Sequence, residues 1–217
     1  MSLALFDLDN TLIAGDSAQL FSEYLAQSHL PTPDNFLDVN AVFMADYDVG
    51  QLDLPAYMRY TLSPLSQLNP EELRNLVNSF LDKTMPGILL PKAHELVSKH
   101  RNAGDDLVIV SATGSHLVYP IAERLNIPHA LAVDVEVKND FLTGEISGIP
   151  TFREGKVTRV QQWAKSQAHE IKHATFYSDS LNDLPLLEMV KRPIAVDPDP
   201  VLEEMAVQKN WEIISLR

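Results

Sequence analysis

The chain has 217 residues, a formal net charge of -13 and no cysteine. This length suits one large domain, or one domain with a sizeable insertion. Without cysteine, disulfides and thiolate chemistry are excluded, and zinc would need His and carboxylate ligands. The acidic balance disfavours nucleic acid and anionic membranes as partners. Because the first apolar run is too short for a signal peptide or a membrane span, we expect a cytoplasmic protein.

The first apolar run predicts a short buried strand over residues 3–6, and two carboxylates follow it directly. Asp7 and Asp9 are two residues apart, and the hydroxyl of Thr11 lies two residues further on. Extended backbone sends alternate side chains to the same side, so the two carboxylates converge beyond the strand end. Because like charges at one point repel, this pattern indicates a divalent cation or a shared proton.

A long section from about Gly15 to Pro86 contains no convincing buried strand. Its apolar stripes predict mostly helical structure over residues 17–81. We interpret this section, residues 15–86, as a helical cap inserted into an α/β core of residues 1–14 and 87–217. The alternative is that these helices belong to the outer layer of the core.

The remainder of the chain alternates short buried runs with helical patterns. Asn139-Asp140 predicts the turn of a β-hairpin between strands over residues 133–137 and 141–146. Other strands are expected at residues 107–110, 174–177, 194–196 and 212–214, and helices at residues 92–102, 115–125, 157–168 and 184–190. Short buried runs between helices favour a parallel sheet with helices on both faces, in which ligands bind beyond the carboxyl ends of the strands.

Further polar side chains follow the later strands or begin helices. Ser111 follows the second buried run, Lys156 begins a helix, and Asp179, Asn182 and Asp183 follow the run that ends at residue 177. Each residue alone is compatible with a helix cap or a solvated side chain. Together and in this order, they predict one site at the carboxyl edge of the sheet.

These motifs resemble those of the haloacid dehalogenase superfamily, in its phosphoserine-phosphatase-like branch (subfamily IB). The resemblance is carried by residues 7–11, Ser111, Lys156 and residues 178–183, and it extends into the cap through residues 50–52 and Arg59. Three stretches are also similar to bacterial hydrolases of this superfamily that are related to histidinol phosphatase: residues 6–12, residues 148–150 with 154–156, and residues 177–187. The family implies a Rossmann-like, doubly wound parallel sheet with a helical cap inserted after the first strand.

The resemblance implies a Mg²⁺-dependent phosphomonoester hydrolase that forms an aspartyl-phosphate. Asp7 is the implied nucleophile, and Asp9 is the implied acid and base. Magnesium would be held by Asp7, the main-chain carbonyl of Asp9 and Asp179. The phosphate would contact Ser111, Lys156 and Asn182, with Thr11 and Asp183 in supporting positions.

The cap residues bear on the substrate, which the sequence leaves open between two amine-bearing phosphate esters. Asp16 suits an ammonium group, and the planar guanidinium of Arg59 suits a carboxylate, so both together fit phosphoserine. Histidinol phosphate has an amine and an imidazole but no carboxylate, and it would gain nothing from Arg59. The small-molecule phosphate ester is the expected partner, and the oligomeric state stays open.

Two other functions fit the same residues. One is phosphoryl transfer from the aspartyl-phosphate to an acceptor other than water. The other is a non-enzymatic module that binds a metal or phosphate for regulation. Phosphate release from esters, with and without Mg²⁺, discriminates between an enzyme and a binding module.

Overall fold

The computed structural model describes residues 2–217 and contains a parallel sheet of six strands. The strand order is β3-β2-β1-β6-β7-β8. The strands are β1 (Leu3–Phe6), β2 (Asp106–Gly114), β3 (His129–Val133), β6 (Thr175–Ser178), β7 (Arg192–Val196) and β8 (Glu212–Ile214). From β1 the chain adds strands first on one side of the sheet, through β2 and β3, and then on the other side, through β6, β7 and β8. This arrangement confirms the expected doubly wound sheet, in which a crevice forms at the carboxyl end of β1.

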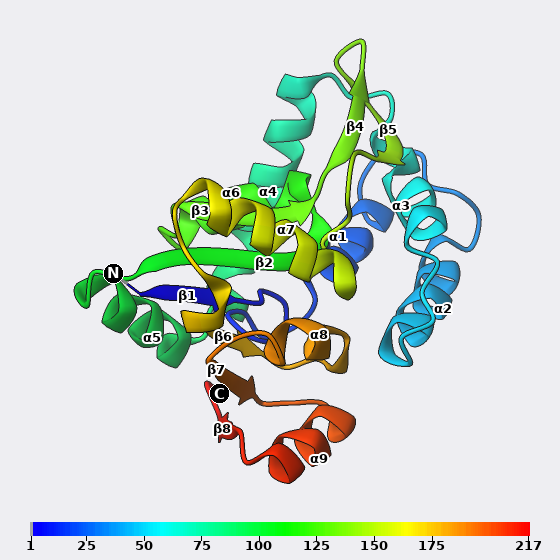
Figure 1. The fold of residues 1–217 in the computed structure, drawn as a ribbon. Helices are drawn as coiled ribbons and strands as arrows, with labels where there is room; N and C mark the ends of the chain where they lie inside the picture. Colours follow the sequence, from blue (N-terminus) through cyan, green and yellow to red (C-terminus); the bar gives the residue numbers. More distant parts are fainter. Residues whose placement is uncertain (1) are drawn as a thin grey trace.

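Helices cover both faces of this sheet, as the continuous apolar runs predict. Ala4 and Phe6 of β1 pack with α5 (Pro91–Asn102) and α6 (Ser115–Arg124). Leu3 and Leu5 point to the opposite face. There they pack with α7 (Glu154–Ser166), α8 (Leu184–Leu187) and α9 (Pro200–Lys209). Figure 1 shows α7 crossing the sheet in front of β2.

The segment between β1 and α5 is helical, as expected. It contains α1 (Ser17–Ala26), α2 (Phe36–Asp48), α3 (Leu54–Leu62), a short 3-10 helix (Ser63–Leu65) and α4 (Pro70–Ile88). In Figure 1, α2 and α3 lie beyond the end of the sheet to which β1 and β2 point. Residue 86, the expected end of the cap, lies inside α4.

The two connections between the sheet and the inserted helices run side by side. Ile13 and Leu89 form an antiparallel bridge, and the N–H of Ala14 donates to the carbonyl of Ile88 at 2.7 Å. The chain therefore leaves and re-enters the core at one place.

The expected strand over residues 133–137 is wrong in its bounds. The chain forms β3, which ends at Val133 and pairs with β2, and then β4 (Val135–Lys138), which pairs with β5 (Phe141–Ile146). Burial explains the division, because Ala132 and Val133 lie in the core whereas Lys138 is exposed.

The structure also contains helix α9 (Pro200–Lys209), which the sequence pattern does not predict. It begins at Pro200, and Asp199 caps it by accepting from the N–H groups of Val201 and Leu202.

The hairpin β4–β5 extends away from the sheet and packs on α3. A Cβ atom on Gly144 would lie 3.1 Å from the Cα of Arg59, so the two backbones are in close contact.

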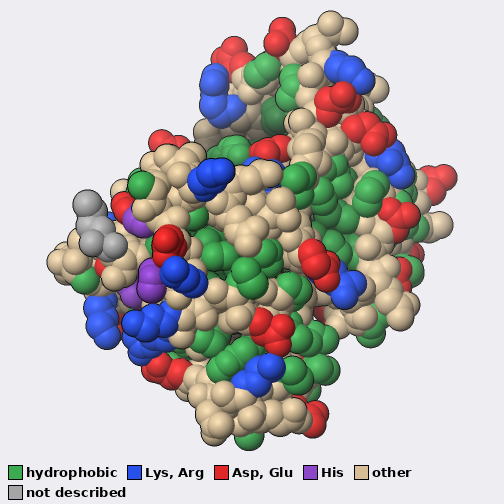
Figure 2. All heavy atoms as spheres, in the orientation of Figure 1, with side chains coloured by type: hydrophobic (Ala, Val, Ile, Leu, Met, Phe, Trp, Pro, Cys, Tyr) green, Lys and Arg blue, Asp and Glu red, His purple; other side chains and the backbone are tan. Residues whose placement is uncertain are grey.

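Figure 2 shows acidic and basic side chains interspersed on the face in view. Within residues 2–217, no helix is both long enough and apolar enough to cross a membrane.

Candidate active site

A pocket lies where β1, β2 and β6 end, between the sheet and the inserted helices. Its empty volume is about 560 Å³. The sheet side is formed by Asp7, Asp9, Asn10, Ser111, Ala112, Thr113, Asp179 and Ser180, and the helical side by Asp16, Ala18, Met44, Tyr47, Leu52, Leu54 and Tyr57. The predicted convergence of strand-end side chains is therefore present.

A buried lysine links two of the carboxylates. The Nζ of Lys156 lies 2.7 Å from Oδ1 of Asp7, and 2.6 Å and 2.8 Å from the two carboxylate oxygens of Asp183. Burial alone would lower the pKa of Lys156, but the charges of Asp183 and Asp7 raise it, so the side chain stays cationic. Ser178 also donates to Asp183, at 2.7 Å. Asp183 thus positions the lysine against Asp7.

Asp9 is oriented by donors from three directions. Its Oδ1 accepts from the main-chain N–H of Ser17 at 2.6 Å. Its Oδ2 accepts from the hydroxyl of Thr113 at 2.8 Å and, more distantly, from Ser111 at 3.4 Å. Ser17 begins α1, so the inserted segment itself fixes the Asp9 carboxylate.

The negative charge of this cluster exceeds the positive charge beside it. Burial, followed by the charge of Asp183, raises the pKa of Asp179 to about 7, although the hydroxyl of Thr11 donates to its carboxylate at 3.1 Å. Burial also raises the pKa of Asp7 well above its ordinary value, against the lowering effect of Lys156. Lys and Arg are absent from the described residues that line the pocket. A bound cation would relieve this imbalance.

The donor set is compatible with a hard divalent cation such as Mg²⁺. Residues 2–217 contain no cluster of three or more His, Cys, Asp or Glu side chains arranged to hold a metal. Magnesium does not need one, because proteins commonly hold it by one or two carboxylates, water and substrate phosphate. Asp7 and Asp179 can supply these two carboxylates on the sheet side of the pocket, which we call its floor.

Asp16 has both a structural position and a place on the pocket wall. It is the N-cap of α1 and accepts from the N–H of Gln19 at 2.8 Å. Burial, and then the charge of Asp9, raises its pKa to about 7. The carboxyl of Asp16 is therefore more readily protonated than that of an ordinary aspartate, and a cation beside it would favour its ionised form.

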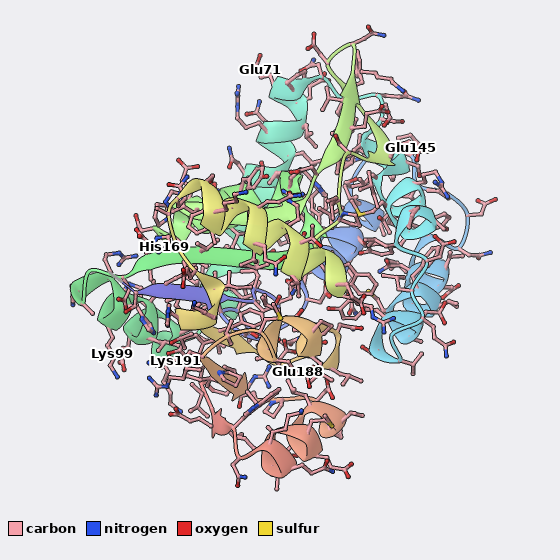
Figure 3. The ribbon with its side chains drawn as sticks, viewed as in Figure 1. Glu71, Lys99, Glu145, His169, Glu188 and Lys191 are labelled. Carbon is pink, nitrogen blue, oxygen red and sulfur yellow. The ribbon has the colours of Figure 1, made fainter. Side chains whose placement is uncertain are left out.

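The structure does not bring Arg59 into the pocket. Arg59 lies on α3, and its guanidinium is 3.3 Å from Glu145 of β5, with both side chains about half exposed. Figure 3 labels Glu145 on the hairpin beside α3. Asn182 also lies outside the pocket wall, and its side-chain N–H donates to the carbonyl of Tyr47 at 3.0 Å. This amide therefore contacts α2 instead of facing the open space.

Sequence reasoning did not assign roles to four residues that shape the site. Ser17, Tyr47, Thr113 and Ser178 contact or face its carboxylates. Thr113 and Ser178 could have been found, because both lie at the strand ends that carry the motifs. The positions of Ser17 and Tyr47 depend on how the inserted helices dock on the sheet, and the local sequence holds no signal for that docking.

Comparison with known proteins agrees with this geometry. The profile of haloacid dehalogenase-like hydrolases matches residues 4–188. A Neisseria meningitidis protein named histidinol-phosphatase is 34% identical over 100% of this chain and 99% of its own length. A Mycobacterium tuberculosis protein named phosphoserine phosphatase SerB1 is 32% identical over 99% of this chain and 70% of its own.

Solved structures share the fold of this chain. A Bordetella pertussis protein of unknown function has 37% identity and a TM-score of 0.92, covering 100% of this chain and 99% of its own. A phosphoserine phosphatase holding a phospho-aspartyl analogue has 21% identity and a TM-score of 0.72, covering 100% of this chain and 93% of its own, and it supports the fold alone. The resemblance seen in the motifs is confirmed: this chain is an enzyme of the haloacid dehalogenase-like hydrolase family.

Proposed function

We propose that the protein is a Mg²⁺-dependent phosphatase that hydrolyses small amine-bearing phosphate monoesters, with histidinol phosphate as the preferred type. The main support is the pocket floor, where Asp7, held by the buried Lys156, lies among carboxylates that lack other cations. The relatives named phosphatases support the same class of reaction. We further propose that the helices of residues 15–86 act as a cap over this floor.

In the proposed mechanism, a carboxylate oxygen of Asp7 attacks phosphorus while the bond to the leaving oxygen breaks. Asp9 gives its proton to that oxygen, and the alcohol leaves. Asp9 then takes a proton from water, whose oxygen attacks phosphorus and releases phosphate from Asp7. When bound by Asp7, Asp179 and the carbonyl of Asp9, Mg²⁺ supplies charge neutralisation for the phosphoryl group.

The phosphoryl group carries negative charge into an acidic pocket, so the protein must supply donors and positive charge. Lys156 supplies the positive charge behind Asp7. Ser111 lies on the pocket floor, where its hydroxyl can turn from Asp9 toward a phosphoryl oxygen. Asp183 holds Lys156 in place, and Thr11 holds Asp179. Asn182 supports this side of the site through its contact with the cap.

The helical side of the pocket, which we call its wall, indicates which alcohol the phosphate ester carries. It combines one carboxylate, Asp16, with the aromatic rings of Tyr47 and Tyr57 and with aliphatic side chains. This wall offers an anion for an ammonium group and apolar surface for a ring, but no cation for a carboxylate. Arg59, the residue expected to bind a carboxylate, is engaged by Glu145 elsewhere. Histidinol phosphate therefore fits the wall better than phosphoserine does.

Phosphate release from histidinol phosphate and phosphoserine, each with Mg²⁺ or with excess EDTA, tests this proposal. We expect Mg²⁺-dependent turnover with a higher kcat/KM for histidinol phosphate. Arg59→Ala serves as the matched variant, and we expect it to leave KM for the preferred ester unchanged. Turnover of neither ester with Mg²⁺ would contradict the proposal, and a large KM increase in Arg59→Ala would contradict its account of the pocket wall.

A further inference from the structure

Tyr47 of α2 lies on the pocket wall, yet the proposed mechanism gives its side chain no chemical step. Asp7, Asp9 and Asp179 line the same pocket. Burial raises the pKa of Tyr47, and the charges of Asp7, Asp183 and Asp179 raise it further, so the hydroxyl keeps its proton. A cap residue therefore presents a neutral O–H group to the floor on which the nucleophile lies.

The position of Tyr47 is fixed by two loops of the sheet side. Its carbonyl accepts from the side chain of Asn182 at 3.0 Å, and its ring lies against Phe152 with centroids 5.9 Å apart. A third contact holds the end of α2, because Arg153 donates to the carbonyl of Gly50 at 2.8 Å. These loops lead directly to Lys156 and to Asp183, which hold each other. Tyr47 is thereby placed relative to the same groups that hold Asp7.

The hydroxyl of Tyr47 makes no hydrogen bond to any residue from 2 to 217 in the structure. Tyr60, Tyr119 and Tyr177, which lie outside the pocket, have hydroxyl partners: the carbonyl of Asp34, Asp134 and His100. Tyr57, which lines the same pocket as Tyr47, has none among the described residues. A phenol hydroxyl that lines a pocket is stabilised when it donates to an acceptor there. The acceptor that suits this hydroxyl is one that arrives with the substrate.

We propose that the hydroxyl of Tyr47 donates a hydrogen bond to a non-bridging phosphoryl oxygen of the substrate. This inference rests on the proposed phosphatase function and adds to it a phosphate-binding group supplied by the cap. The phosphoryl group must sit over Asp7, the carboxylate whose charge acts most strongly on the Tyr47 phenol. A hydrogen bond to an anionic oxygen is stronger than one between neutral groups and grows as charge develops on that oxygen.

Tyr47→Phe is the direct test, because it removes the hydroxyl and keeps the ring on Phe152 and the carbonyl that faces Asn182. Tyr60→Phe is the matched control, since that tyrosine lies on α3 of the same cap but outside the pocket wall. With Mg²⁺ and histidinol phosphate, we expect kcat/KM of Tyr47→Phe to fall roughly tenfold to a hundredfold. We expect its inhibition constant for inorganic phosphate to rise, its melting temperature to stay unchanged, and Tyr60→Phe to match the unsubstituted protein.

Two results would overturn the inference. One is an unchanged inhibition constant for phosphate in Tyr47→Phe, and the other is an equal loss of kcat/KM in both variants. If the unsubstituted protein hydrolyses no ester, the proposed function fails on its own. Calorimetric titration of both variants with inorganic phosphate and Mg²⁺ then still decides whether the Tyr47 hydroxyl binds phosphate.

Discussion

Asp16→Asn separates the two roles of this side chain, which are capping α1 and presenting a negative charge to the pocket. The amide oxygen of Asn can accept the hydrogen bond from Gln19, so the cap is kept. The charge is lost. Burial, and then Asp9, raises the pKa of Asp16 from 3.8 to about 7, so ionising it in the folded protein is unfavourable.

The sign and size of the effect follow from this raised pKa. Between pH 4 and pH 7 the folded state binds more protons at Asp16 than the unfolded state does, so this carboxyl lowers stability as pH rises through that window. The rise in pKa from 3.8 to about 7 corresponds to at most about 4 kcal/mol at pH 8 and to less than half of that at pH 5. Because the Asp16 side chain is only partly buried, solvent reduces this figure, and Asp16→Asn should raise the free energy of unfolding by about 1–2 kcal/mol at pH 8.

Urea unfolding of both proteins in EDTA, at pH 5 and pH 8, measures this difference directly. Comparing the pair isolates Asp16 from the other buried carboxylates, which are common to both. The variant should also have a higher KM for histidinol phosphate, because the partner of the ammonium group is gone. Equal or lower stability of Asp16→Asn at pH 8 would refute the argument that burial of this charge destabilises the fold.

Three further substitutions test the floor of the pocket. Asp7→Asn should keep the fold by thermal unfolding but lose phosphate release by more than about a thousandfold, because the amide is not a nucleophile; near-normal turnover would exclude Asp7 as nucleophile. Lys156→Met should lower the free energy of unfolding by about 3–5 kcal/mol in urea, because Asp7 and Asp183 lose their buried cation; a change below about 1 kcal/mol would contradict that pairing. Thr113→Val should reduce kcat about tenfold with KM unchanged, because Asp9 loses a donor; steady-state kinetics with a normal kcat would show that Thr113 does not position Asp9.

The floor of the pocket was predictable because parallel strands place their carboxyl ends at one edge. This rule brings Asp7 beyond β1, Ser111 of β2 and Asp179 beyond β6 into one pocket. The division between β3 and β4 was not predictable from the apolar pattern, which continues across Asp134. It depends instead on which neighbouring strand each half meets.

The helical wall was less predictable than the floor. Arg59 and Tyr47 both lie on helices of the inserted segment, and only the docking of those helices decides which one faces the carboxylates. Docking depends on contacts distant in sequence, such as the one between Asn182 and the end of α2. Spacing within a helix carries no information about such contacts.

The bridge between Ile13 and Leu89 brings the two ends of the inserted helices to one place, while these helices share one hydrophobic core with the sheet. A deletion from Ile13 to Leu89 would keep all six strands of the sheet in the chain but would remove the helices that complete this core. Such a deletion would remove Asp16, Tyr47 and Tyr57 together, while Asp7, Lys156 and Asp179 remain. The nucleophile and the groups proposed to contact the alcohol are thus carried by different segments of the chain, and the inserted segment also orients Asp9 through Ser17.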